Sequence, residues 1–99
     1  MAKKELLGNF AVDSGQVMIG DPCYLDDFEN DDYKEDGEKN NYSYSGACAT
    51  TTTNENGGEL LTNGVSVAVV SSTGMGDGIY PVYAVKEDGR IKELIIKFF

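Results

Sequence analysis

Two-residue turns between short apolar runs limit the fold of this chain more than any other feature. Asn63-Gly64 and Asp88-Gly89 both favour the positive φ angles that a tight β-hairpin needs. The runs that they separate are rich in β-branched and aromatic residues, which favour strands. These runs are Glu59–Thr62 and Val65–Ser72 around the first turn, and Ile79–Val85 and Ile91–Phe99 around the second. The C-terminal half is therefore predicted to be antiparallel β-structure.

The N-terminal half carries weaker strand signals. Gly8–Val12 and Gln16–Gly20 flank the turn residues Asp13-Ser14-Gly15, and this pattern predicts another hairpin. Tyr42–Thr53 begins with alternating tyrosine and serine and continues as a threonine run, which favours a strand through β-branching. Met1–Leu7 is interpreted as a charged leader that precedes the first strand.

Together these elements predict an all-β fold. About seven short strands joined by glycine-containing turns are typical of a small antiparallel β-sandwich or barrel, and one short helix is compatible with this fold. Ninety-nine residues suffice for one domain with its own core. We expect residues 1–99 to form a single β domain with an acidic loop at 25–41, where Leu25 and Phe28 fall at the spacing of a short helical turn.

Composition removes several classes of function. The chain has no histidine, so the commonest general base and the commonest transition-metal ligand are both missing. Cys23 and Cys48 are too few for a disulfide scaffold or for a tetrahedral zinc site, and their small or apolar neighbours predict buried structural thiols. We therefore expect no catalytic residue, no metal and no cofactor. A secretory signal and a membrane-spanning run are also not expected, which favours the cytoplasm.

The negative charge is concentrated in one segment. The net charge is −9, and Asp21–Glu38 holds nine acidic residues against Lys34 alone. The rest of the chain is almost neutral, with eight acidic and seven basic residues. Direct binding to nucleic acid needs clustered Lys and Arg, so it is not expected. A calcium-loop register starting at Asp32 places Ser43 where a glutamate ligand is required, and a solvated loop is the better interpretation.

A glycine-rich loop joins two of the predicted strands. Gly74, Gly76 and Gly78 alternate with Met75 and Asp77. The pattern lacks both the helix of a dinucleotide fingerprint and the lysine of a phosphate loop. We expect a tight turn in which Asp77 caps its own loop backbone, with a nest of amides for a small anion as the alternative.

Four segments together carry a resemblance to a known group of proteins. They are Gly20–Leu25 (GDPCYL), Tyr44–Cys48 (YSGAC), Gly76–Tyr83 (GDGIYPVY) and Gly89–Ile91 (GRI). In this order they resemble an uncharacterised family of small bacteriophage and bacterial proteins, a domain of unknown function, over Phe10–Phe99. The resemblance implies a phage or prophage origin. It supplies no activity, cofactor or catalytic residue.

Two classes of function follow. The first is a non-enzymatic binding protein, an inhibitor or accessory factor that docks a basic surface of a host protein through the acidic segment. The alternative is a small-ligand-binding or enzymatic domain with its site around Asp21, Cys23 and Asp77. The candidate binding residues for both classes are Asp21, Cys23, Tyr24, Asp26, Asp27, Asp31, Asp32, Gly76, Asp77, Gly78 and Tyr80.

Overall fold

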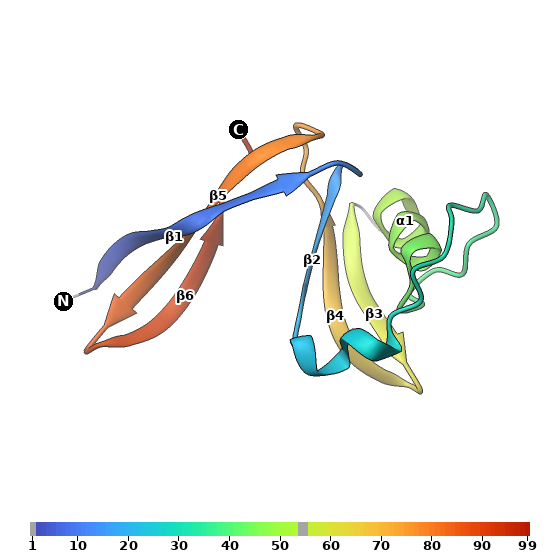
Figure 1. Ribbon diagram of the computed structural model, residues 1–99, viewed down its shortest axis with the longest axis horizontal. Coiled ribbons are helices and arrows are strands. Elements are labelled where there is room, and N and C mark those ends of the chain that lie inside the picture. Colours follow the sequence, from blue (N-terminus) through green and yellow to red (C-terminus); the bar gives the residue numbers. More distant parts are fainter. Residues whose placement is uncertain (1, 54–55) are drawn as a thin grey trace. The chain divides into compact units, whose positions relative to one another are not determined.

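The computed structural model describes residues 2–53 and 56–99, and the chain divides into two compact units. We call Met1–Gly15 with Thr73–Phe99 the terminal unit, and Gln16–Ser72 the central unit. Each unit is built on one three-stranded antiparallel sheet, and the predicted all-β class is confirmed (Figure 1).

The terminal unit contains the sheet with strand order β1-β5-β6. Its strands are β1 (Lys3–Val12), β5 (Gly78–Glu87) and β6 (Arg90–Ile96). Asp88 and Gly89 have φ angles of 54° and 75°, so the hairpin turn predicted between β5 and β6 is confirmed. Tyr80, only 2% exposed, packs edge-on against Phe98 with ring centroids 5.3 Å apart.

The central unit combines a sheet, an α-helix and a 3-10 helix. The sheet has the order β2-β4-β3, with β2 (Gln16–Gly20), β3 (Gly57–Thr62) and β4 (Val65–Ser72). The 3-10 helix η1 (Pro22–Asp27) follows β2, and the helix α1 (Tyr44–Thr53) packs against β3 and β4 (Figure 1). The core is apolar and consists of Tyr42, Ala47, Leu60, Val67, Ala68 and Val70, with Met18 and Phe28 packed against it.

The two N-terminal strands form as predicted, but they do not form a hairpin with each other. β1 pairs with β5, whereas β2 pairs with β4. The predicted leader is also wrong, because β1 begins at Lys3 and its first residues pair with the end of β5. The turn residues Asp13-Ser14-Gly15 indicate only that the chain turns there. They do not determine which distant strand pairs with β1 or with β2.

The strand predicted at Tyr42–Thr53 is the helix α1, so the described residues contain six strands instead of about seven. Ser43 caps the helix, because its Oγ accepts the backbone N–H of Gly46 at 2.9 Å. The four threonines satisfy their hydroxyls inside the helix by donating to carbonyls four residues earlier, as Thr50 does to Gly46 at 2.8 Å. Each of the four threonine hydroxyls therefore has an acceptor within α1.

Candidate functional site

The Gly20–Leu25 segment forms a tight, solvent-exposed turn. Oδ1 of Asp21 accepts the backbone N–H of Cys23 at 2.9 Å, and Asp21 is the N-cap of η1. Pro22 follows at the start of the helix, where its missing N–H needs no partner. The carbonyl of Asp21 also accepts the N–H of Tyr24 at 3.0 Å. Asp21 therefore shapes the turn that carries Cys23 and Tyr24.

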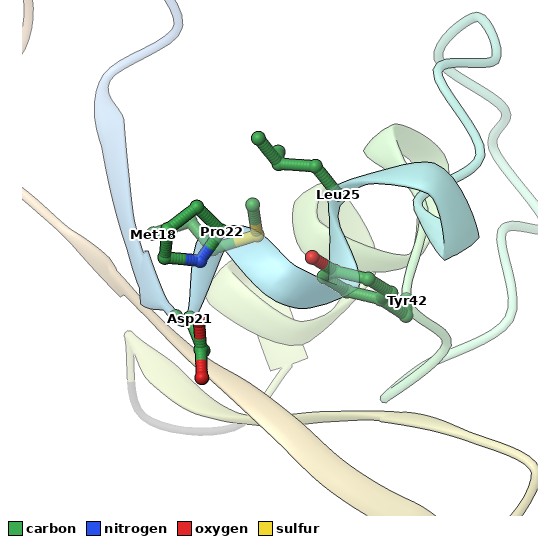
Figure 2. Close-up of a pocket in the computed structure, with 6 residues that line it drawn as sticks. Met18, Asp21, Pro22, Leu25 and Tyr42 are labelled. Atoms are coloured by element: carbon green, nitrogen blue, oxygen red, sulfur yellow. The ribbon is translucent and has the colours of Figure 1, made fainter.

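A pocket of about 190 Å³ lies against this turn (Figure 2). It is lined by Met18, Gly20, Asp21, Pro22, Leu25 and Tyr42, which come from β2, η1 and the segment before α1. The side chains of Met18, Pro22 and Leu25 make its wall apolar. Leu25 is 59% exposed, so the pocket opens to solvent beside the Leu25 side chain.

Tyr42 brings a polar group to this apolar pocket. The residue is 3% exposed, and its ring packs edge-on against Phe28 at 5.0 Å between centroids. Its backbone is held on both sides, since its N–H donates to Leu61 and its carbonyl accepts from Glu29. In Figure 2 the hydroxyl points toward the space between Pro22 and Leu25. No described residue makes a hydrogen bond to this hydroxyl.

The two cysteines differ from the prediction of buried structural thiols. Cys23 is exposed and lies on η1, a surface helix that has no buried residue. Cys48 is half-buried in α1, and its sulfur accepts a hydrogen bond from Nε2 of Gln16 at 3.4 Å. Both thiols are free.

Most of the acidic segment (Asp21–Glu38) presents its carboxylates to solvent. Eight of its nine acidic residues are exposed, namely Asp21, Asp26, Asp27, Glu29, Asp32, Glu35, Asp36 and Glu38. The ends of the stretch after η1 are fixed to the unit. The Glu29 carbonyl accepts the N–H of Tyr44 at 2.9 Å, and the Asn40 carbonyl accepts the N–H of Leu61 at 2.8 Å. The intervening carboxylates are thus held on an anchored loop.

Asp31 is the exception in this segment, because its carboxylate holds the start of α1. Oδ1 accepts the backbone N–H of Ser45 at 2.8 Å, and Oδ2 accepts the hydroxyl of Ser45 at 2.6 Å. These two hydrogen bonds, with a smaller contribution from Lys34 at 3.6 Å, lower the pKa of the Asp31 carboxyl below its usual value. Asp31 therefore stabilises the helix as well as contributing charge.

Neither a metal centre nor a membrane helix emerges from these residues. In the part of the chain that the structure describes, no three His, Cys, Asp or Glu side chains gather closely enough to hold a metal ion. Within residues 2–53 and 56–99, no helix has the length and apolarity to cross a bilayer.

The glycine loop belongs to the terminal unit, and Asp77 does not cap its own loop as predicted. Its Oδ1 accepts the backbone N–H of Gly15 at 2.8 Å, so it ties the loop to the end of β1. The Gly76 carbonyl accepts the hydroxyls of Thr73 at 2.6 Å and of Tyr80 at 2.7 Å. Gly76 has a φ of 84°, which only glycine adopts readily. These bonds give the loop a structural role.

Replacing Asp77 tests that role. Asp77→Ala removes the acceptor of the Gly15 N–H and should lower stability by about 1 kcal/mol, whereas Asp77→Asn keeps an amide oxygen there and should be nearly neutral. Urea unfolding of both variants beside the wild type measures the difference. Equal stability of all three proteins would show that the loop is held without this hydrogen bond.

The predicted site residues fall into two groups. Asp21, Cys23, Tyr24, Asp26 and Asp27 share the η1 turn of the central unit, and Asp31 and Asp32 follow in the same acidic segment. A second set belongs to the terminal unit and comprises Gly76, Asp77, Gly78 and Tyr80. A joint site of Asp21, Cys23 and Asp77 stays a prediction.

Of the residues that line the pocket, only Asp21 was among the candidate binding residues, and Met18, Gly20, Pro22, Leu25 and Tyr42 were missed. Tyr42 was missed because Tyr42–Thr53 was predicted to be one regular strand. That prediction gave no reason to expect the Tyr42 hydroxyl at the wall of a pocket. The one usable signal was the helical spacing of Leu25 and Phe28, since η1 does form there and the Phe28 N–H donates to the Leu25 carbonyl at 3.1 Å.

Comparisons with known proteins place the chain in a family. Searches of the curated proteins and of the solved structures found no significant match. A family model described as a protein of unknown function, DUF4241, matches residues 1–96, which is nearly the whole chain. This supports the predicted resemblance to an uncharacterised domain. The chain therefore belongs to the DUF4241 family.

Proposed function

We propose that this chain is a non-enzymatic binding protein that docks a basic surface of a host protein through its acidic segment. The observation that carries the proposal is the division of charge between the units. The central unit holds eleven of the seventeen acidic residues but only two of the eight basic ones. The terminal unit holds six of each, so the whole net charge of −9 belongs to the central unit.

The state of the carboxylates supports a docking role. Asp31 makes an ion pair with Lys34, but none of the eight exposed carboxylates makes an ion pair with a described residue. Like charges gathered in this way repel each other and are a cost to the folded unit unless a basic partner neutralises them. Such a surface attracts a cationic partner over a distance and makes association fast and dependent on salt.

The proposal extends to the setting of the protein. A phage or prophage origin is the expectation carried by the family resemblance, and the partner is then a host protein in the cytoplasm. An acidic domain that covers a basic surface competes with whatever anion that surface normally binds, so an inhibitor or accessory factor is the proposed form.

The alternative, a small-ligand site, is favoured by one observation, namely that Asp21 lines an apolar pocket. An enzymatic version is less favoured, because the Asp21 carboxylate, the candidate base beside Cys23, already accepts the Cys23 N–H and has a structural role in the turn. We keep a ligand site around Asp21, Cys23 and Asp77 as the second candidate.

Neutralising the exposed carboxylates tests the docking function. A variant with Asp26→Asn, Asp27→Asn, Asp32→Asn and Glu35→Gln keeps Asp31 and should melt near the wild-type temperature, because it only removes exposed like charges. Host proteins captured by the immobilised wild type at low salt should be lost from this variant and from the wild type at high salt.

A matched control removes four carboxylates from the terminal unit, with Asp13→Asn, Glu87→Gln, Asp88→Asn and Glu93→Gln. This control reduces the net negative charge by the same amount and should still capture the same proteins. Equal capture by all three proteins would contradict docking through the acidic segment.

A further inference from the structure

The size of the pocket beside η1 sets the class of its occupant. Small-molecule and cofactor sites enclose roughly 300–1,000 Å³, and this pocket, with about 190 Å³, is smaller. A dry apolar cavity of about 150 Å³ is known to hold a benzene ring. One phenyl-sized group therefore fills this pocket, whereas a nucleotide or a cofactor does not fit.

The walls favour an aromatic ring in particular. Met18, Pro22 and Leu25 offer apolar surface, and the thioether of a methionine makes favourable contacts with aromatic rings. Tyr42 closes the pocket with its own ring edge and hydroxyl (Figure 2). Aromatic side chains are enriched at protein–protein interfaces, and the residues that contribute most to binding cluster in well-packed pockets near the centre.

The Tyr42 hydroxyl offers the pocket a hydrogen-bond donor that no described residue uses. Tyr42 is 3% exposed, and its hydroxyl opens onto the pocket, since no buried side-chain N or O atom of the described residues lacks a partner. A polar group at the wall of an apolar pocket gains most from a partner that supplies an acceptor there. A peptide segment that inserts its side chain brings backbone carbonyls to the same place.

The surroundings of the pocket select a cationic segment. Asp21 lines the pocket, and Asp26 and Asp27 lie on the same short helix as Leu25. No lysine or arginine is among the lining residues. We propose that this pocket receives one phenyl side chain from a partner segment in which Lys or Arg flank that residue, and that a backbone carbonyl of the segment accepts a hydrogen bond from Tyr42. This inference rests on the proposed function, because it assigns the anchor of the same basic partner.

Three capped peptides separate the anchor from the charge. The full probe is Arg-Lys-Phe-Lys-Arg, the second replaces its phenylalanine by alanine, and the third is the neutral Ser-Gly-Phe-Gly-Ser. Each is titrated to millimolar concentration into the ¹⁵N-labelled chain and followed by ¹H–¹⁵N NMR. The full probe should give saturable shifts at the amides of Leu25 and Tyr42, with an affinity at least tenfold above that of the alanine peptide.

Two pocket variants and one control sharpen the result. Tyr42→Phe deletes only an unbonded hydroxyl, so it should leave the melting temperature unchanged and weaken the full probe about fivefold. Leu25→Ala removes one exposed wall and should weaken it as well. Ile19→Ala removes a side chain of similar exposure, 53%, on the face of β2 opposite to Met18, and should change nothing.

The outcomes distinguish this inference from the proposed function. Equal binding of the phenylalanine and alanine peptides, or unchanged affinity in Tyr42→Phe and Leu25→Ala, overturns the aromatic anchor while docking by charge stands. Equal binding of the basic and neutral phenylalanine peptides keeps the anchor and overturns docking by charge. Absence of saturable shifts with every peptide overturns both.

Discussion

Replacing Gly46 by alanine is expected to destabilise the central unit by about 3 kcal/mol or more. A Cβ atom built at Gly46 would lie 2.1 Å from the carbonyl oxygen of Asn41 and 2.8 Å from Oγ of Ser43. Neither neighbour can yield easily, because the Asn41 oxygen accepts the N–H of Ser43 and the Ser43 Oγ caps the helix. The start of α1 would have to move away from the segment that lines the pocket.

The sign of this effect is informative. In an ordinary helix, alanine is favoured over glycine by about 1 kcal/mol, so helix propensity alone predicts that Gly46→Ala stabilises the protein. A loss of stability can therefore be assigned to the close approach of Asn41 and Ser43. Gly8→Ala is the control, because its Cβ would meet nothing within 4 Å and its φ is not positive.

Urea unfolding monitored by far-UV circular dichroism compares these variants with the wild type. Gly8→Ala should stay within about 0.5 kcal/mol of the wild type. A Gly46→Ala protein as stable as the wild type would mean that the Asn41–Ser43 backbone relaxes without cost, and the anchoring of the pocket to α1 would have to be abandoned.

The elements that could be predicted from sequence are those whose signal is local. Asn63 and Gly64 have φ angles of 51° and 76°, as a tight hairpin turn requires, and β3 and β4 pair across them. The strand predicted at Val65–Ser72 has the bounds of β4. Such turns restrict the chain over two residues, so neighbouring sequence determines them.

The helix α1 could not be predicted because distant residues stabilise it. Tyr44–Thr53 has no amphipathic pattern, and its threonines favour strands. The helix is capped by Ser43, which directly precedes it, and by Asp31, which lies fourteen residues before Ser45. Glycine at position 46 permits the contact with Asn41, and that requirement is invisible without the fold.

The candidate site was predicted only in part for the same reason. The acidic segment is a matter of composition, and its exposure follows from charge. The pocket, by contrast, joins Met18 from β2 with Leu25 from η1 and Tyr42 from the segment just before α1. Sequence spacing cannot place three such residues around one cavity, since their approach depends on how β2, η1 and α1 pack.

Removing the Asp31 carboxylate is expected to lower the melting temperature clearly, in contrast to its exposed neighbours. Asp31→Ala deletes both acceptors of Ser45 and leaves a helix-start N–H without a partner. Asp31→Asn retains one acceptor but loses the charge, so it should fall between Asp31→Ala and the wild type. Asp32→Asn is the matched control, because this adjacent carboxylate is exposed and should be dispensable for stability.

The pH dependence of these melts separates a charged cap from a merely polar one. The pKa of Asp31 is lowered, chiefly by the Ser45 hydroxyl and then by its N–H, so the folded protein binds a proton there less readily than the unfolded chain does. Its contribution is therefore fully present above the ordinary aspartate pKa of about 3.9 and is lost as the pH falls through the lowered pKa. The gap in melting temperature between wild type and Asp31→Asn should be widest near neutral pH and should close in acid. A gap that stays constant from neutral pH down into acid would show that the carboxylate charge does not hold α1, and that the amide serves equally well.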